Sequence, residues 1–177
     1  MQTSDPHPGL AWLTFSLMTV ISWGVYGVLL HSGQVAMSDP INGRYKAFLF
    51  VGIAYFLIAV LAPIGALALN GASWRFPASG MWWSLVAGIA GAVGAFCVLL
   101  AFGAKGSPAA VMSIVFGGAP IVNAAVALLV HPPPGGWSAL RWQFLLGIAL
   151  AAIGGCLVTL YKPPPSKIPP AVASDPK

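Results

Sequence analysis

Five long apolar stretches constrain the fold of this chain more than any other feature. A helix needs about 20 apolar residues to cross the hydrocarbon core of a bilayer. The stretches that reach this length cover residues 10–30, 47–69, 81–103, 108–130 and 143–161. They predict an all-α fold, a polytopic bundle of five transmembrane helices within residues 10–161. Residues 1–9 are then an N-terminal tail, and residues 162–177 a Pro-rich tail.

The composition agrees with a lipid environment. Of the 177 residues, 58% are hydrophobic and only 6% are charged, whereas a soluble domain usually carries about 25% charged residues. Water would solvate such a surface poorly, so the lipid bilayer is the expected partner. Nucleic acid is not an expected partner, because no basic stripe interleaves with aromatic residues.

The distribution of positive charge predicts the orientation. With five spans, one side of the membrane holds the N-terminus, Arg75 and Arg141. The other side holds six positive residues, which are Arg44, Lys46, Lys105, Lys162, Lys167 and Lys177. Cytoplasmic loops carry the excess of Lys and Arg. The count therefore predicts the N-terminus outside, the C-terminus inside and a cytoplasmic Pro-rich tail.

The breaks between the spans contain recognisable turn and cap residues. His31 to Lys46 is read as a polar loop, because it contains the turn signals Asp39-Pro40 and Asn42-Gly43. Ser107 is expected to cap the fourth helix, with Pro108 at its first position, where the missing N–H is harmless. The run from His131 to Gly136 contains three prolines and two glycines, which exclude a helix.

Polar residues follow one face of the first span. Ser16, Thr19, Trp23 and Tyr26 recur at helical spacing. Hydroxyl groups in hydrocarbon need protein or water as partners, so this face should point inward. One interpretation is the wall of a substrate path, and the other is hydrogen bonding between helices.

The fourth span contains a proline at its middle. Pro120 cannot donate to the Phe116 carbonyl, so a kink is expected there, and the two glycines close to it weaken the helix further. Ser113, Gly117, Pro120 and Asn123 share one stripe of this span. A broken helix at mid-membrane, with freed carbonyls and a nearby amide, is one way to build a binding site. A kink that only improves packing is the alternative.

Small residues recur along two other spans. Gly147, Ala151 and Gly155 are spaced four apart in the fifth span. The third span carries Ala87, Gly88, Gly91, Gly94 and Ala95 on one side. Such patterns let two helix backbones approach closely, so we interpret both as packing faces.

The sequence contains no constellation for enzymatic or metal chemistry. The three acidic residues lie outside the spans, and no nucleophile motif or metal-ligand spacing is present. Cys97 and Cys156 are interpreted as packing residues. His31 is the only titratable candidate near the bilayer, and a histidine with satisfied hydrogen bonds is the preferred interpretation. We therefore expect no enzyme, no catalytic residue, no cofactor and no metal.

Five short motifs recur along the spans, and they are Ser22-Trp23-Gly24, the stretch Ala101 to Ala109, Pro120-Ile121-Val122, Leu145-Leu146-Gly147-Ile148 and Ala152-Ile153-Gly154-Gly155. Together they resemble one repeat of an EamA-like transporter, a family of the drug/metabolite transporter superfamily. The resemblance covers about residues 14–161. It implies a carrier of a small organic metabolite, with its site between two inverted repeats, in a bacterial inner membrane.

The chain departs from this family in two respects. A Glu often follows the fourth span of such repeats, but here the sequence reads His131-Pro132-Pro133. The chain also holds one five-helix repeat instead of two. Transport would then require a homo- or hetero-oligomer, with an inverted second half supplied by a partner. The alternative is a non-catalytic accessory or structural subunit of a larger membrane complex.

Overall fold

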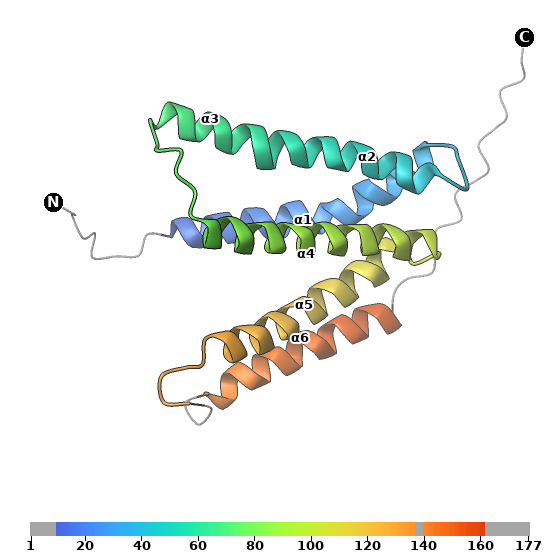
Figure 1. Cartoon of the computed structure of the whole chain (residues 1–177). Helices are drawn as coiled ribbons and strands as arrows, with labels where there is room; N and C mark the ends of the chain where they lie inside the picture. Colours follow the sequence, from blue (N-terminus) through green and yellow to red (C-terminus); the bar gives the residue numbers. More distant parts are fainter. Residues whose placement is uncertain (1–9, 137–139, 162–177) are drawn as a thin grey trace, which may run out of the picture. The chain divides into compact units, whose positions relative to one another are not determined.

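A computed structural model describes residues 10–136 and 140–161 of the chain, and these residues form helices and turns without any strand. In chain order the elements are α1 (Ala11–Ala36), α2 (Gly43–Phe56), the π-helical segment η1 (Leu57–Leu61), α3 (Ala62–Leu69), α4 (Ala78–Gly103), α5 (Pro108–Val130) and α6 (Trp142–Leu160) (Figure 1). Because α2, η1 and α3 are continuous, they form one long helix. Five helices are therefore long and apolar enough to cross a membrane, which confirms the predicted all-α class.

The described residues fall into two compact units. The first unit runs to Met112 and contains α1 to α4 with the beginning of α5. The second unit begins at Ser113 and contains the rest of α5 with α6.

The turn between the first two helices is much shorter than the predicted loop. The α1 helix continues to Ala36 and α2 already begins at Gly43. The prediction that His31 to Lys46 is a loop is therefore wrong at both ends. Polar residues such as His31 and Gln34 remain helical because their polarity does not disfavour a helix, and only Asp39-Pro40 interrupts it.

The second long helix widens for one turn before a proline. The segment Leu57–Leu61 is π-helical, and the Ala62 N–H donates to the Leu57 carbonyl five residues earlier. Pro63 follows directly, and a proline ring normally collides with the carbonyl four residues before it. A wider turn at this place relieves the collision, and the helix continues to Leu69.

A Schellman motif ends α4 and reverses the chain. The Gly106 N–H donates to the Ala101 carbonyl at 2.9 Å, and the Lys105 N–H donates to the Phe102 carbonyl at 3.0 Å. Lys105 adopts the left-handed conformation that this motif requires, with φ 68°. A side chain at Gly106 would collide with the Ala101 carbonyl, so glycine is needed there. The turn to α5 is consequently only four residues long.

The beginning of α5 agrees with the sequence. The Ala110 N–H lies 3.4 Å from the Ser107 hydroxyl oxygen, and the helix begins at Pro108 as predicted. Its first turns belong to the first unit, where Ala110 and Met112 are buried. The Met112 side chain lies directly against Gly27 of α1, at a place where a Cβ atom would collide with it.

The core of the first unit is small and lies along one side of α4. Leu99 is fully buried, and its neighbours on the helix face, Ala95, Val98 and Phe102, are at most 5% exposed. Leu30 and Ala47 are also buried, and they belong to α1 and α2. Phe48 of α2 packs on Phe96 of α4, with ring centroids 5.5 Å apart. The three helices are therefore held by interdigitated side chains near the α1–α2 turn.

In the second unit, α5 and α6 approach each other at two glycines. A Cβ atom built on Gly117 would lie 3.2 Å from the Gly155 Cα, and one built on Gly155 would lie 3.0 Å from the Ser113 carbonyl oxygen. The predicted packing role of Gly155 is confirmed. By contrast, a Cβ atom on Gly147 would have no neighbour within 4 Å, so this part of the predicted stripe is open.

A break at Pro120, which was one of the two interpretations, does not form. The α5 helix runs without interruption from Pro108 to Val130, with Pro120 inside it. A proline removes only one hydrogen bond of the helix, and the surrounding turns keep theirs. The interpretation of a broken helix with freed carbonyls is therefore wrong, whereas the predicted helix end before His131 is confirmed.

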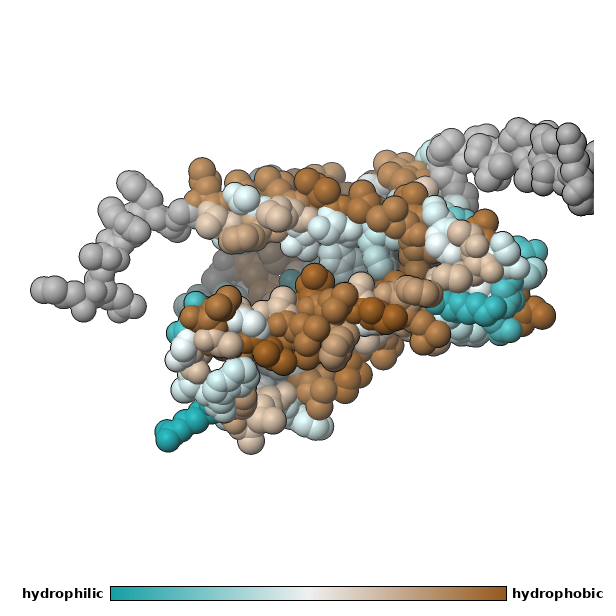
Figure 2. Space-filling model, turned by 90° about the horizontal axis from the view of Figure 1, so that it is seen from above, coloured by the Kyte–Doolittle hydropathy of each residue, from teal (hydrophilic) through white to brown (hydrophobic). Residues whose placement is uncertain are grey.

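Apolar residues dominate the outside of the helices. Figure 2 shows hydrophobic colouring over much of the visible face and hydrophilic colouring mainly at the ends of the helices. Large side chains such as Leu49, Ile58 and Trp83 are about 70% exposed. Such surfaces suit a hydrocarbon solvent, and the five helices together define an integral membrane protein.

Candidate functional site

The inward face of α1 carries a stripe of buried or half-buried residues, several of which are polar or aromatic. Its members recur with the periodicity of one helix face, and they are Trp23, Tyr26, Gly27, Leu30, His31 and Gln34. This α1 stripe begins with two of the predicted path residues. It then continues into a region that the sequence had placed in a loop.

A polar cavity lies at the end of the α1 stripe that is nearest the α1–α2 turn. Its volume is about 410 Å³. Its lining comes from α1, α2, α4 and the turn, and consists of His31, Gln34, Val35, Ser38, Asp39, Pro40, Arg44, Phe102 and Gly103. We call this the turn cavity.

Three side chains of the turn cavity have a buried polar atom without a hydrogen-bond partner among the described residues. They are His31 at Nδ1, Gln34 at Oε1 and Arg44 at Nε. A buried polar group without a partner costs free energy, so natural proteins rarely leave several together. No described residue satisfies His31 at Nδ1, although its ring packs edge-on against Phe102 with ring centroids 5.5 Å apart.

Arg44 is the main charged group of this cavity. Its side chain occupies the space above Gly103, where any Cβ atom would collide with the guanidinium. Its Cζ atom lies 5.0 Å from the centre of the Tyr45 ring, in cation–π geometry. Among the described residues no carboxylate is paired with Arg44.

The nearby carboxylate has other partners. Asp39 accepts hydrogen bonds from the Asn42 N–H at 2.8 Å and the Ile41 N–H at 3.1 Å, and it binds Lys46 Nζ at 2.7 Å. The backbone donor of Asn42, followed by Lys46, lowers the pKa of Asp39 from 3.8 to about 2. Asp39 therefore stays ionised and fixes the turn, while its charge is already matched by Lys46.

The middle of the α1 stripe lines a second, mostly apolar cavity. Tyr26 and Ser22 of α1 face Phe50 and Ala54 of α2 around about 390 Å³. The Trp23 and Tyr26 rings lie 5.5 Å apart, and the buried Tyr26 hydroxyl has no partner among the described residues. The structure thus brings Trp23 and Tyr26 together. The Tyr26 hydroxyl is a polar group without a described partner in the middle of α1.

Ser16 and Thr19 have a different arrangement. Both are exposed, and their hydroxyls donate to carbonyls of their own helix, Ser16 to Trp12 at 2.7 Å and Thr19 to Phe15 at 2.9 Å. Neither hydroxyl needs another helix as a partner. Within the described residues, Ser16 and Thr19 therefore form no hydrogen bond with another helix.

The predicted path residues of α5 line two grooves against α6. Ser113 and Gly117 border an apolar groove of about 440 Å³, together with Thr159. Pro120 and Asn123 border another groove of about 490 Å³, together with Gln143. Asn123 and Gln143 are the polar groups of that groove. These residues belong to the second unit, so the structure groups them with one another and not with the α1 stripe.

Sequence reasoning missed Gln34 and Arg44 as site residues. The signal was available, because Tyr26, Leu30 and Gln34 continue the helical spacing of the α1 stripe. This spacing was not followed beyond Leu30, because the polar stretch from His31 was interpreted as a loop. No sequence signal showed that Arg44 and Gly103 would meet, since they lie 59 positions apart in different helices.

The described residues were also compared with the patterns of metal ligands and disulfides. Within the parts of the chain that the structure describes, no three His, Cys, Asp or Glu residues gather as metal ligands. Cys97 and Cys156 are free and exposed. Neither cysteine is buried against other described residues, so the predicted packing role is not observed there.

Comparison with known proteins adds no relative. No family model matches the chain, and neither a curated protein nor a solved structure is significantly similar to it. The resemblance to an EamA-like repeat therefore stays a prediction. The fold and the site define the chain only as a helical integral membrane protein with a polar cavity in its first unit.

Proposed function

We propose that this membrane protein moves a small organic solute, and that the α1 stripe is part of its path. The observation that carries the proposal is the row of buried polar groups on α1. Tyr26, His31 and Gln34 each have a polar atom without a partner among the described residues. In hydrocarbon such groups are costly unless water or a solute reaches them. A stripe of this kind suits a hydrated path better than a purely structural helix.

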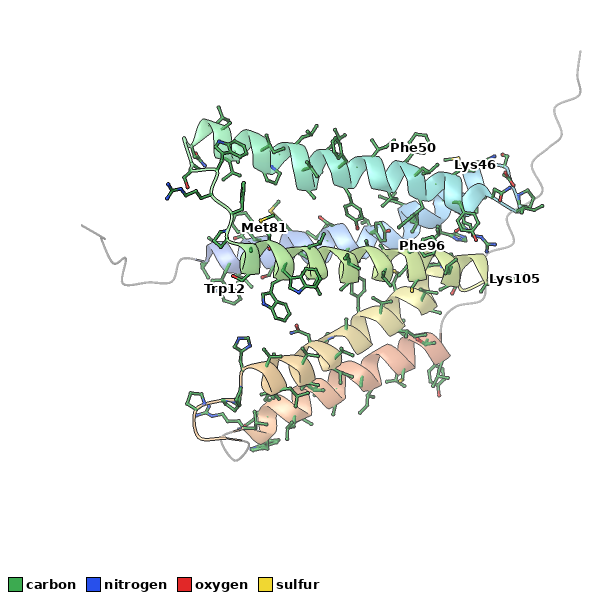
Figure 3. All side chains as sticks on the ribbon, in the orientation of Figure 1. Trp12, Lys46, Phe50, Met81, Phe96 and Lys105 are labelled. Carbon is green, nitrogen blue, oxygen red and sulfur yellow. The ribbon has the colours of Figure 1, made fainter. Side chains whose placement is uncertain are left out.

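The direction of the path follows from the charges of the first unit. Lys46 and Lys105 lie at one end of this unit, and Trp12 and Met81 lie at the other (Figure 3). Arg44 lies two residues before Lys46, on the same turn of the chain. The positive-inside rule then places the turn cavity on the cytoplasmic side, with the N-terminus outside. A bacterial inner membrane fits the resemblance to EamA-like carriers.

A single five-helix chain needs a partner for alternating access. We therefore propose a homo- or hetero-oligomer, in which a second five-helix half completes the path. The excess of positive charge on one side favours a single orientation, so an inverted half would come from another protein. Single cysteines introduced as Ser4→Cys and Ser174→Cys test this, since each should be labelled from one side only.

Water access to the α1 stripe tests the path directly. The test uses the full chain in liposomes, with Cys97 and Cys156 first replaced by Ser. A membrane-impermeant thiol reagent is then applied to Tyr26→Cys and, as a matched control, to Val28→Cys, whose native side chain is 56% exposed on the outer surface. We expect labelling of Tyr26→Cys and none of Val28→Cys. Absence of labelling at position 26 would contradict a hydrated path.

Efflux measurements connect the path with function. Proteoliposomes are loaded with a panel of radiolabelled amino acids, sugars and organic acids, and efflux is compared with that of empty vesicles. If Asn123 also contacts the solute, Asn123→Leu should abolish the flux without unfolding the chain. Val122→Leu, next to it on an exposed position, is the control and should transport normally.

An accessory role is the second candidate, and an open helix face favours it. Cβ atoms built on Gly88, Gly91 and Gly94 of α4 would have no neighbour within 4 Å. Small residues of this kind accept a closely packed partner helix. Co-purification of a large stoichiometric partner, together with an unlabelled Tyr26→Cys and no solute flux, would replace the transport proposal with this one.

A further inference from the structure

We propose that the turn cavity binds an anionic oxygen group, a carboxylate or a phosphate. The inference rests on the proposed function in one respect, since it names the chemical class of the solute that would pass along the α1 stripe. The group is carried either by a free solute or by a lipid headgroup. Both sources offer the same chemistry to Arg44.

The charge of Arg44 is the first reason. Its guanidinium is half-buried and always positive, and its Nε atom has no partner among the described residues. Asp39 is the only acidic residue within residues 10–136 and 140–161, and it is bound to Lys46. The positive charge in the cavity is thus uncompensated by these residues, and an anion supplies the missing charge.

The geometry of Arg44 is the second reason. The guanidinium of Arg44 fits into the space that Gly103 leaves open, and it lies over the face of the Tyr45 ring. These two contacts hold it beside the cavity. A planar guanidinium with fixed N–H groups matches the two oxygens of a carboxylate or phosphate. Holding it in place beforehand lowers the entropy lost on binding.

The neighbouring groups are the third reason. Gln34 and His31 line the same cavity, and each has an unused polar atom. The unpartnered atom of Gln34 is its Oε1 acceptor, and a flip of the amide brings the Nε2 N–H donors into its place. The His31 ring presents a donor from one of its nitrogens. Ser38 adds a hydroxyl to the lining. The cavity, at about 410 Å³, admits a small organic anion or a headgroup.

Binding can be measured apart from transport by nuclear magnetic resonance of histidine. The chain has three histidines, so ¹⁵N-histidine labelling gives few signals, and His31→Gln assigns the one in the cavity. The full chain in an uncharged maltoside detergent is titrated with inorganic phosphate. We expect a saturable change of the His31 signal and no change of the His131 signal.

Two charge variants make the test specific. Arg44→Gln removes the guanidinium, and we expect phosphate to bind at least about tenfold more weakly. Lys105→Gln removes a positive charge at the same end of the first unit but outside the cavity lining, so binding should stay as in the parent chain (Figure 3). Arg44→Lys is the second cavity variant if Arg44→Gln does not fold. It keeps the charge without the planar group, and should weaken binding several-fold.

A second arm distinguishes the two sources of the anion. The labelled chain is placed in phosphatidylcholine bicelles, and phosphatidylglycerol is then added. A His31 change that only phosphatidylglycerol produces, and that Arg44→Gln removes, assigns the cavity to a lipid headgroup. A change with inorganic phosphate assigns it to a free anion.

The inference is overturned if neither phosphate nor phosphatidylglycerol changes the His31 signal. It is also overturned if Arg44→Gln, or Arg44→Lys in its place, binds as tightly as the parent chain. Labelling of Tyr26→Cys is independent of these results. A labelled Tyr26→Cys with no anion binding would leave a path for another class of solute, and anion binding without labelling would leave a binding site without a path.

Discussion

The two units of this chain are held together in different ways. In the first unit, α1, α2 and α4 enclose a small core of side chains around Leu99, with Met112 filling the space at Gly27. In the second unit no described residue is buried, and α5 and α6 meet through the backbones of Gly117 and Gly155. Both arrangements suit a bilayer, because helix association in lipid depends on packing and not on hydrophobic burial.

The difference also separates the polar groups. The first unit surrounds a turn cavity with His31, Gln34 and Arg44, whose polar atoms need partners. The second unit offers mainly apolar grooves, with Asn123 and Gln143 as the amides of one of them. In the first unit, side-chain packing holds the charged site in place. In the second unit, a glycine contact joins α5 and α6, and this unit has no charged site among its described helices. Ligand chemistry is therefore expected first in the first unit.

The largest predicted effect lies in the core of the first unit. Leu99 is fully buried, so Leu99→Ala leaves a cavity and should lower the free energy of unfolding by about 2–5 kcal/mol. Leu85→Ala, at a position of the same helix that is 57% exposed, should change it by less than about 1 kcal/mol. Unfolding in mixed micelles, followed by circular dichroism, measures both. Equal losses for the two variants would mean that the first unit has no side-chain core.

The glycine contact of the second unit gives a smaller effect. Gly155→Leu pushes a side chain against the Ser113 carbonyl, and should lower the free energy of unfolding by about 1–3 kcal/mol. The adjacent Gly154 has open space within 4 Å, so Gly154→Leu should be neutral or slightly stabilising through helix propensity. The same unfolding titration compares them. If Gly154→Leu were the more damaging variant, the close contact of α5 with α6 would be misplaced.

The smallest predicted effect concerns the α1–α2 turn and appears only in acid. The pKa of Asp39 is lowered from 3.8 to about 2 in the folded chain, mainly by the Asn42 N–H. Its stabilising contribution is therefore complete above about pH 4 and is lost as the pH falls towards 2. Melting temperatures of the parent chain should fall across this window more steeply than those of Asp39→Asn. Parallel profiles would show that the carboxylate does not stabilise the turn.

Part of this structure was predictable because local chemistry decides it. Ser107-Pro108 predicts the beginning of α5, and the three prolines after His131 predict its end, as observed. Gly155 predicts a close helix contact. Long-range packing decided the rest. Gly88 and Gly94 belong to the same kind of pattern as Gly155, yet have no neighbour within 4 Å.

The errors have specific physical causes. Polarity was taken to end α1 at about Leu30, but polar residues at a helix end continue the helix when their groups face a cavity, as His31 and Gln34 do. A broken helix at Pro120 was one of two interpretations, but the loss of a single hydrogen bond does not interrupt α5. The π-helical turn before Pro63 had no sequence signal beyond the proline itself. Arg44 lies in the site because it packs on Gly103, and this contact between distant residues depends on the tertiary fold.

Hydrogen–deuterium exchange of the full chain in phosphatidylcholine nanodiscs tests the central claim, that five helices lie within the bilayer. We predict slow exchange in the middle of α1, of the continuous α2–η1–α3 helix, of α4, of α5 and of α6. The connecting residues 37–42, 70–77 and 104–107 should exchange within seconds to minutes. Exchange at the centre of any of the five helices as fast as in these connections would contradict a membrane-spanning bundle.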